Sequence, residues 1–173
     1  MLAAACAPNI KKSSADDSPE QMALRENPVN GDKVSLIGFG CMRWPMIKDS
    51  DGKDIIDQEA VNEMVDYAIE HGINYFDTSP VYLQGQSEKA AGIALSRHPR
   101  EKYFIATKLS NFGDQSPEGS KQMYYNSFKQ LQTDYFDYYL LHSIGRGGKE
   151  AFNKRYIENG LWEFLQGEKA ADL

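Results

Sequence analysis

The chain has 173 residues, of which 41% are hydrophobic and 12% aromatic, so it can bury a sizeable core. Its net charge of −6 and its pI near 5.1 argue against general nucleic-acid binding, which needs a basic face to displace counterions from phosphates. The sequence contains no apolar run of about 18 residues, so we predict no transmembrane segment. Its two cysteines, Cys6 and Cys41, are too few for a four-cysteine iron–sulfur or zinc site, and the three histidines show no metal-binding spacing.

Residues 1–30 differ in composition from the rest of the chain. The stretch APNIKKSSADDSPEQ is polar and aperiodic, which predicts a flexible tail or tether before a domain over residues 31–173. The preceding MLAAAC resembles the end of a bacterial lipoprotein signal in which Cys6 would be lipidated, although the basic and apolar parts of such a signal are missing. Two interpretations stay open. One is a cytoplasmic protein with an incidental Ala-rich start, and the other is an exported lipoprotein with a trimmed signal.

From Lys33 onward, strand and helix patterns alternate. The run KVSLIGFGCM at 33–42 predicts one strand whose glycines allow a close approach of the backbone. Apolar residues at helical spacing predict a helix over Asp57–His71, followed by Gly72. INYFDT then predicts the second strand, and a helix capped by Ser87 follows it.

The second half of the chain continues this alternation. KYFIATK predicts the third strand, and Tyr124, Phe128 and Leu131 mark one face of the next helix. YFDYYLLH predicts the fourth strand, before a helical stretch over residues 150–170 that is interrupted at Asn159 and Gly160. Four β/α units without an internal repeat predict an α/β fold with a parallel sheet, here the first four units of a TIM-type (β/α)8 barrel.

Side-chain alternation places ionisable residues at the ends of three strands. If the strands line a barrel, Asp77, Lys108 and His142 each take the last inward-facing position. The inward face would also carry Tyr75, Phe104, Ala106, Phe136, Tyr138 and Leu140. A single buried Asp or Lys is usually a structural ion pair, but barrel enzymes place their chemistry at this end of the strands. Three such residues in succession therefore favour an active site.

Together with Tyr82, these residues form a set that suits carbonyl reduction. Hydride transfer to a carbonyl leaves negative charge on oxygen, and the phenol of Tyr82 would protonate it as general acid. The ammonium of Lys108 would favour the ionised phenol, and Asp77 would hold that ammonium in place. His142 would donate to or orient the carbonyl, or take part in the proton relay.

Four segments of the chain resemble the aldo-keto reductases, over roughly residues 25–173. They are KVSLIGFGCMRWP, HGINYFDTSPVYLQGQSEKAAGIAL, REKYFIATK and LQTDYFDYYLLH. The likeness is greatest to a bacterial branch whose members often carry a ferredoxin-like iron–sulfur tail, which this sequence lacks. The resemblance implies a (β/α)8 barrel, NADPH or less often NADH as cofactor, an aldehyde or ketone substrate, and Asp77, Tyr82, Lys108 and His142 as catalytic residues.

The same resemblance predicts that half of the barrel is missing. In the family most cofactor contacts come from later strands and loops, so the sequence identifies no cofactor-binding residues. We therefore expect a truncated chain that is inactive alone and that either self-associates through its open sheet edges or is a poorly stable monomer. Trp44 would line a substrate pocket or pack in the core. Two alternatives stay open, namely a non-catalytic partner or regulatory subunit of the same fold, and an inert fragment.

Overall fold

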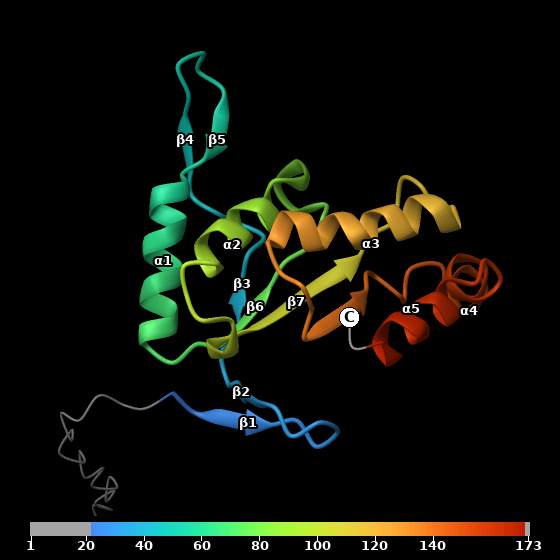
Figure 1. Ribbon diagram of the computed structural model, residues 1–173. Coiled ribbons are helices and arrows are strands. Elements are labelled where there is room, and N and C mark those ends of the chain that lie inside the picture. Colours follow the sequence, from blue (N-terminus) through green and yellow to red (C-terminus); the bar gives the residue numbers. More distant parts are fainter. Residues whose placement is uncertain (1–21, 172–173) are drawn as a thin grey trace, which may run out of the picture.

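The computed structural model describes residues 22–171, and Figure 1 shows their arrangement. The centre is a four-stranded parallel sheet in the order β3-β6-β7-β8. Its strands are β3 (Phe39–Gly40), β6 (Tyr75–Asp77), β7 (Phe104–Leu109) and β8 (Tyr138–Leu141). The parallel sheet and the helices between its strands confirm the predicted partial TIM-type fold.

Helices cover one face of this sheet. The α-helices are α1 (Gln58–Glu70), α2 (Ser87–Leu95), α3 (Pro117–Leu131), α4 (Gly148–Phe152) and α5 (Leu161–Ala170). Two short 3-10 helices, η1 (Tyr82–Gly85) and η2 (Arg100–Lys102), and one π-helical turn, η3 (Asn153–Ile157), complete the set. The main core lies between the sheet and the first two α-helices, where Phe76 and Ile105 meet Val65 and Leu95.

Local sequence explains how these helices begin and pack. The Asp57 side chain caps α1 by accepting from the Ala60 N–H at 3.1 Å, and Gly72, with φ +83°, follows the end of the helix. Helices α2 and α3 approach closely at Gly92, where an added Cβ would lie 2.7 Å from the Leu131 Cα. A glycine is therefore required at this crossing.

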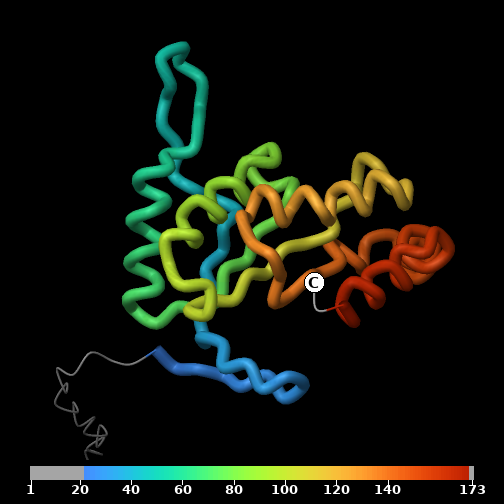
Figure 2. Tube along the Cα trace, viewed as in Figure 1, coloured from blue at the N-terminus to red at the C-terminus, as the bar shows by residue number. Residues whose placement is uncertain are grey.

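Two antiparallel hairpins extend from opposite ends of the molecule (Figure 1, Figure 2). The first pairs β1 (Leu24–Glu26) with β2 (Lys33–Ser35), and the second pairs β4 (Met46–Lys48) with β5 (Asp54–Ile56). Strand β1 lies inside the range 1–30 predicted to be a tail, so regular structure begins before that boundary. Residue Cys6, the predicted lipidation site, lies outside the described residues.

The single strand predicted at 33–42 is wrong, because β2 and β3 belong to different sheets. Ser35 binds Asn74 in both directions, through Ser35 N–H to Asn74 Oδ1 at 2.7 Å and Asn74 N–H to Ser35 Oγ at 3.1 Å. The chain bends after this contact and leaves Leu36 and Ile37 exposed. Only Phe39 and Gly40 then pair with β6.

Two further expectations need correction. Ser87 does not cap α2, because its hydroxyl donates instead to the Cys41 carbonyl oxygen at 2.6 Å. Phe136 does not face the barrel interior, because β8 begins only at Tyr138 and the alternation does not extend back to it. Its ring stacks on Phe128 of α3, with 4.0 Å between ring centroids. Among the described helices, none has the length and hydropathy needed to cross a membrane.

Candidate active site

An ion pair lies at the carboxyl ends of β6 and β7. Lys108 Nζ donates to Asp77 Oδ1 at 2.6 Å and to the Thr78 carbonyl oxygen, also at 2.6 Å. Lys108 is only 9% exposed, so its ammonium is buried, whereas the Asp77 side chain is 33% exposed. Burial of an unpaired ammonium is costly, and this pairing keeps the charge in a defined position at the strand ends.

Tyr82 lies directly beside this ion pair. Its ring centroid is 5.0 Å from Lys108 Nζ, and its ring meets the His142 imidazole edge-on, with 5.9 Å between centroids and planes at 88°. The next two residues, Leu83 and Gln84, have φ of +48° and +56°, which costs non-glycine residues about 1–2 kcal/mol each. Leu83 packs against the core and offsets part of this strain. The turn thereby brings the phenol to the strand ends.

His142 directly follows β8 and joins the same edge of the sheet. Its Nδ1 lies 2.6 Å from Ser110 Oγ and 3.4 Å from Ser79 Oγ. Burial, and then the positive charge of Lys108, lower the pKa of His142, while Asp77 opposes that shift. This shift favours the neutral form of the imidazole at neutral pH. The structure thus brings together Asp77, Lys108 and His142, as the alternation along the strands predicts, and adds Tyr82 from η1.

Sequence reasoning missed four polar residues around His142, namely Ser79, Ser110, Asn111 and Arg155. Arg155 comes from η3, where its Nε donates to Asn111 Oδ1 at 2.6 Å and one guanidinium N–H donates to the His142 carbonyl oxygen at 3.4 Å. These bonds tie the segment after β8 to the segment after β7. Sequence position could have pointed to two of them, because Ser79 and Ser110 each lie two residues after a predicted catalytic residue.

Trp44 and Cys41 lie behind the site, in the core. The Trp44 ring stacks on Phe39 with 5.5 Å between centroids and is 4% exposed, in agreement with the packing alternative. Cys41 is wholly buried, and that burial strongly raises the pKa of its thiol. Glu88 is buried nearby and accepts from Thr107 Oγ1 at 2.6 Å, and its burial raises the pKa of the carboxyl group. Within residues 22–171, no group of three or more His, Cys, Asp and Glu side chains could hold a metal ion.

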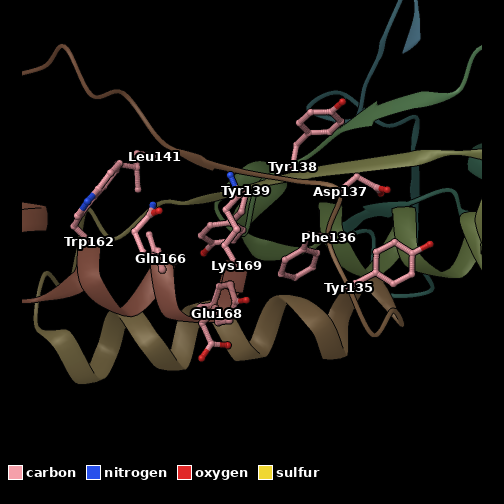
Figure 3. Close-up of a pocket in the computed structure, with 12 residues that line it drawn as sticks. Tyr135, Phe136, Asp137, Tyr138, Tyr139, Leu141, Trp162, Gln166, Glu168 and Lys169 are labelled. Atoms are coloured by element: carbon pink, nitrogen blue, oxygen red, sulfur yellow. The ribbon is translucent and has the colours of Figure 1, made fainter. Parts of the chain in front are cut away.

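A cavity of about 640 Å³ lies elsewhere, between β8 and α5 (Figure 3). Half of its lining residues are aromatic, and they include Tyr135, Phe136, Tyr138, Tyr139 and Trp162. None of Asp77, Tyr82, Lys108 and His142 lines it. Cavity size and the predicted chemistry therefore point to different parts of the molecule.

The fold and the position of the ion pair are those of a TIM-type barrel enzyme with its polar residues at the carboxyl ends of the strands. The sequence pattern of the Aldo/keto reductase family matches residues 36–160. The chain therefore belongs to this family of oxidoreductases, which confirms the resemblance seen in the sequence.

Individual relatives support this assignment. The chain is 35% identical over 125 residues to "Probable aldo-keto reductase 1" of Glycine max, covering 67% of this chain and 35% of that protein. It is 36% identical over 132 residues to L-galactose dehydrogenase of Arabidopsis thaliana, covering 73% and 40%. Among solved structures, the holo form of aldo-keto reductase AKR11C1 from Bacillus halodurans matches with a TM-score of 0.62 and 30% identity, covering 85% of this chain and 47% of that one. The chain thus spans less than half of each of these relatives.

Proposed function

We propose that this chain carries the acid–base residues of an NAD(P)H-dependent reductase that converts an aldehyde or ketone to an alcohol. One observation carries the proposal: the Tyr82 ring packs against Lys108 Nζ, which Asp77 holds at 2.6 Å, and against His142. An acid, a cation and a neutral donor are the groups that a carbonyl oxygen requires while it gains negative charge.

The donor set also fits the need for a nicotinamide cofactor. No amino-acid side chain supplies a hydride, and the bound nicotinamide would provide it to the carbonyl carbon. Tyr82, Lys108 and His142 are proton donors and a cation, so they suit the oxygen end of the reaction. NADPH is the cofactor that we propose, and NADH is the comparison to test against it.

The proposed mechanism follows the charge on oxygen. The substrate carbonyl oxygen accepts hydrogen bonds from the Tyr82 hydroxyl and from the His142 imidazole. As the carbonyl carbon is reduced, the C=O π electrons move to oxygen, and the Tyr82 proton is transferred to form the alcohol. The ammonium of Lys108 stabilises the phenolate that remains, and Asp77 keeps that ammonium beside it. A proton from solvent then restores the phenol.

We also propose that the chain associates with a second copy through β8. This strand is one of the two outer strands of the sheet, and within residues 22–171 no strand pairs with its free edge. Leu140 of β8 is 39% exposed. Exposed strand edges present free N–H and C=O groups that favour pairing. Light scattering should show a mass that rises with concentration, and a constant monomer mass would contradict this arrangement.

Turnover tests the proposed reaction. The protein purified from its native cells should oxidise NADPH in the presence of at least one member of a panel of aldehydes, ketones and quinones. The same panel with NADH ranks the two cofactors. If neither cofactor is oxidised with any of the carbonyls, the proposed function is contradicted. Oxidation of the cofactor in the absence of a carbonyl would indicate a different reaction.

A further inference from the structure

Two buried serines connect His142 to the neighbouring strands. Ser79 follows β6, Ser110 follows β7 and His142 follows β8, and these strands are neighbours in the sheet. Ser79 and Ser110 are 0% and 1% exposed. Their hydroxyl oxygens lie 2.8 Å apart, and Ser110 Oγ lies 2.6 Å from His142 Nδ1. The three side chains therefore form one hydrogen-bonded chain that is closed to solvent at its serine end.

Proton counting gives this hydrogen-bonded chain a direction. At its far end the Val81 N–H, which can only donate, points to Ser79 Oγ at 3.4 Å. If Ser79 donates to Ser110 and Ser110 donates to His142 Nδ1, both hydroxyl protons have an acceptor. In the reverse direction Nδ1–H donates to Ser110 and Ser110 donates to Ser79. The Ser79 proton then has no acceptor in the described part of the chain, which leaves a buried donor unsatisfied at the cost of its desolvation.

We propose that Ser79 and Ser110 are positioning residues that hold neutral His142 in the tautomer protonated at Nε2. This inference rests on the proposed function, because it specifies what His142 offers to the substrate, namely an N–H donor. If the single Ser79 proton goes to His142 Nδ1 instead, at 3.4 Å, Nδ1 is again the acceptor and the tautomer is the same.

This tautomer separates the roles of the two groups near the substrate oxygen. An Nε2–H group donates to a carbonyl oxygen, whereas an Nε2 lone pair would repel that oxygen and compete for the Tyr82 proton. The rings of Tyr82 and Phe112 lie against the imidazole, at 5.9 Å and 5.1 Å between centroids, and restrict its rotation. His142 therefore orients the carbonyl, and Tyr82 remains the group that gives up its proton.

Nitrogen NMR of the full chain with ¹⁵N-labelled histidines tests the tautomer without any substrate. The sequence has three histidines, and His142→Gln identifies the signals of the third. We expect a protonated Nε2 and an unprotonated Nδ1 at His142 at neutral pH. Ser110→Ala should mix the two tautomers, and Ser110→Thr should restore the wild-type signals. Ser127→Ala is the matched control, because it removes an equally buried hydroxyl from α3 that donates to the Met123 carbonyl oxygen.

A predominantly Nδ1-protonated His142 in the wild type would overturn the inference, as would unchanged signals in both Ser110→Ala and Ser79→Ala. If Ser110→Ala does not fold, Ser79→Ala still tests the direction of the hydrogen-bonded chain. With a carbonyl substrate, Ser110→Ala should lower kcat by about tenfold, less than the loss of an oxyanion donor itself, and leave KM for the cofactor nearly unchanged. Absence of turnover in the wild type would refute the proposed function and leave the tautomer result standing. Normal turnover with the other tautomer would refute only this inference.

Discussion

The carboxyl ends of β6, β7 and β8 and the cavity beside β8 are both rich in polar and aromatic groups. The two regions differ in whether their polar groups are hydrogen-bonded. At the strand ends, Lys108 has two acceptors at 2.6 Å, and Ser79, Ser110 and His142 bind one another. Beside the cavity, the Tyr124 and Tyr139 hydroxyls are buried without a hydrogen-bond partner in the part of the chain that the structure describes.

This difference separates a positioned site from a packed interface. Paired polar groups hold one geometry, and a reaction centre needs one. Around the cavity, Tyr124 makes edge-on contacts with Phe136, Tyr139 and Phe164, so its ring is held by aromatic packing. Burial strongly raises the pKa of the Tyr139 hydroxyl, which remains a neutral phenol. Pairing of polar groups therefore marks the candidate site better than cavity volume does.

The largest expected effect is at Tyr82. Tyr82→Phe should lower kcat by about two orders of magnitude or more and leave cofactor affinity nearly unchanged, because only the general acid is lost. Tyr138→Phe is the control, since Tyr138 is also inward-facing but its hydroxyl donates to Asp32 at 2.6 Å, away from the site. Steady-state kinetics on both variants measure the difference. Wild-type turnover in Tyr82→Phe would refute the assignment.

Lys108→Met should abolish or strongly reduce turnover and lower the free energy of unfolding by about 1–3 kcal/mol, because Asp77 and Thr78 lose a charged donor. Lys48→Met is the matched control. Its ion pair with Asp54 has a similar length, 2.8 Å, but both side chains are 63% exposed, so its loss should cost about 0–1 kcal/mol. Urea denaturation of both variants compares the two ion pairs. Equal losses in the free energy of unfolding would show that the Lys108–Asp77 pair contributes no more than an exposed surface pair.

Tyr139→Phe should leave the free energy of unfolding unchanged or raise it by about 1 kcal/mol, because it removes a buried hydroxyl that has no partner in residues 22–171. Ser110→Ala removes a paired hydroxyl and should lower that free energy by about 1 kcal/mol. Opposite signs in thermal or urea unfolding would support the contrast between the two regions. A clear loss of stability in Tyr139→Phe would mean that its hydroxyl has a partner after all.

The smallest effect concerns pH. Since the native pKa of His142 lies below its ordinary value of 6.5, the unfolded chain binds the proton first as the pH falls. The contribution of His142 to the free energy of unfolding should therefore be constant above about pH 6.5 and decrease as the pH is lowered below that value. The free energy of unfolding, measured by urea denaturation across this pH range, should depend less steeply on pH in His142→Gln than in the wild type. A substitution of the exposed His71, His71→Gln, is the control. An identical slope in wild type and His142→Gln would contradict the account.

Much of the fold was accessible from sequence because the signals are local. Helical spacing at Val61 and Val65 and the Asp57 cap predict α1, and alternation predicts the inward positions of Asp77 and Lys108. Phe136 was misplaced because alternation applies only within a strand, and β8 starts two residues later.

The remaining features depend on non-local contacts. Asn74, thirty-nine positions along the chain, binds Ser35 where β2 ends and the chain bends toward β3. Ser79 and Ser110 act together only because β6, β7 and β8 lie side by side in register. A serine after a strand is ordinary in sequence, so its pairing with His142 becomes visible only in three dimensions.

The residues around Lys108 are proposed to serve carbonyl reduction by direct hydride transfer. The most direct measurement uses NADPH that is deuterated on the transferred face of its nicotinamide ring, with an aldehyde substrate found in the turnover panel. Mass spectrometry of the alcohol should show one deuterium on the former carbonyl carbon, at a rate that falls with Tyr82→Phe. An alcohol without deuterium from cofactor labelled on either face, or a rate indifferent to Tyr82, would contradict the account.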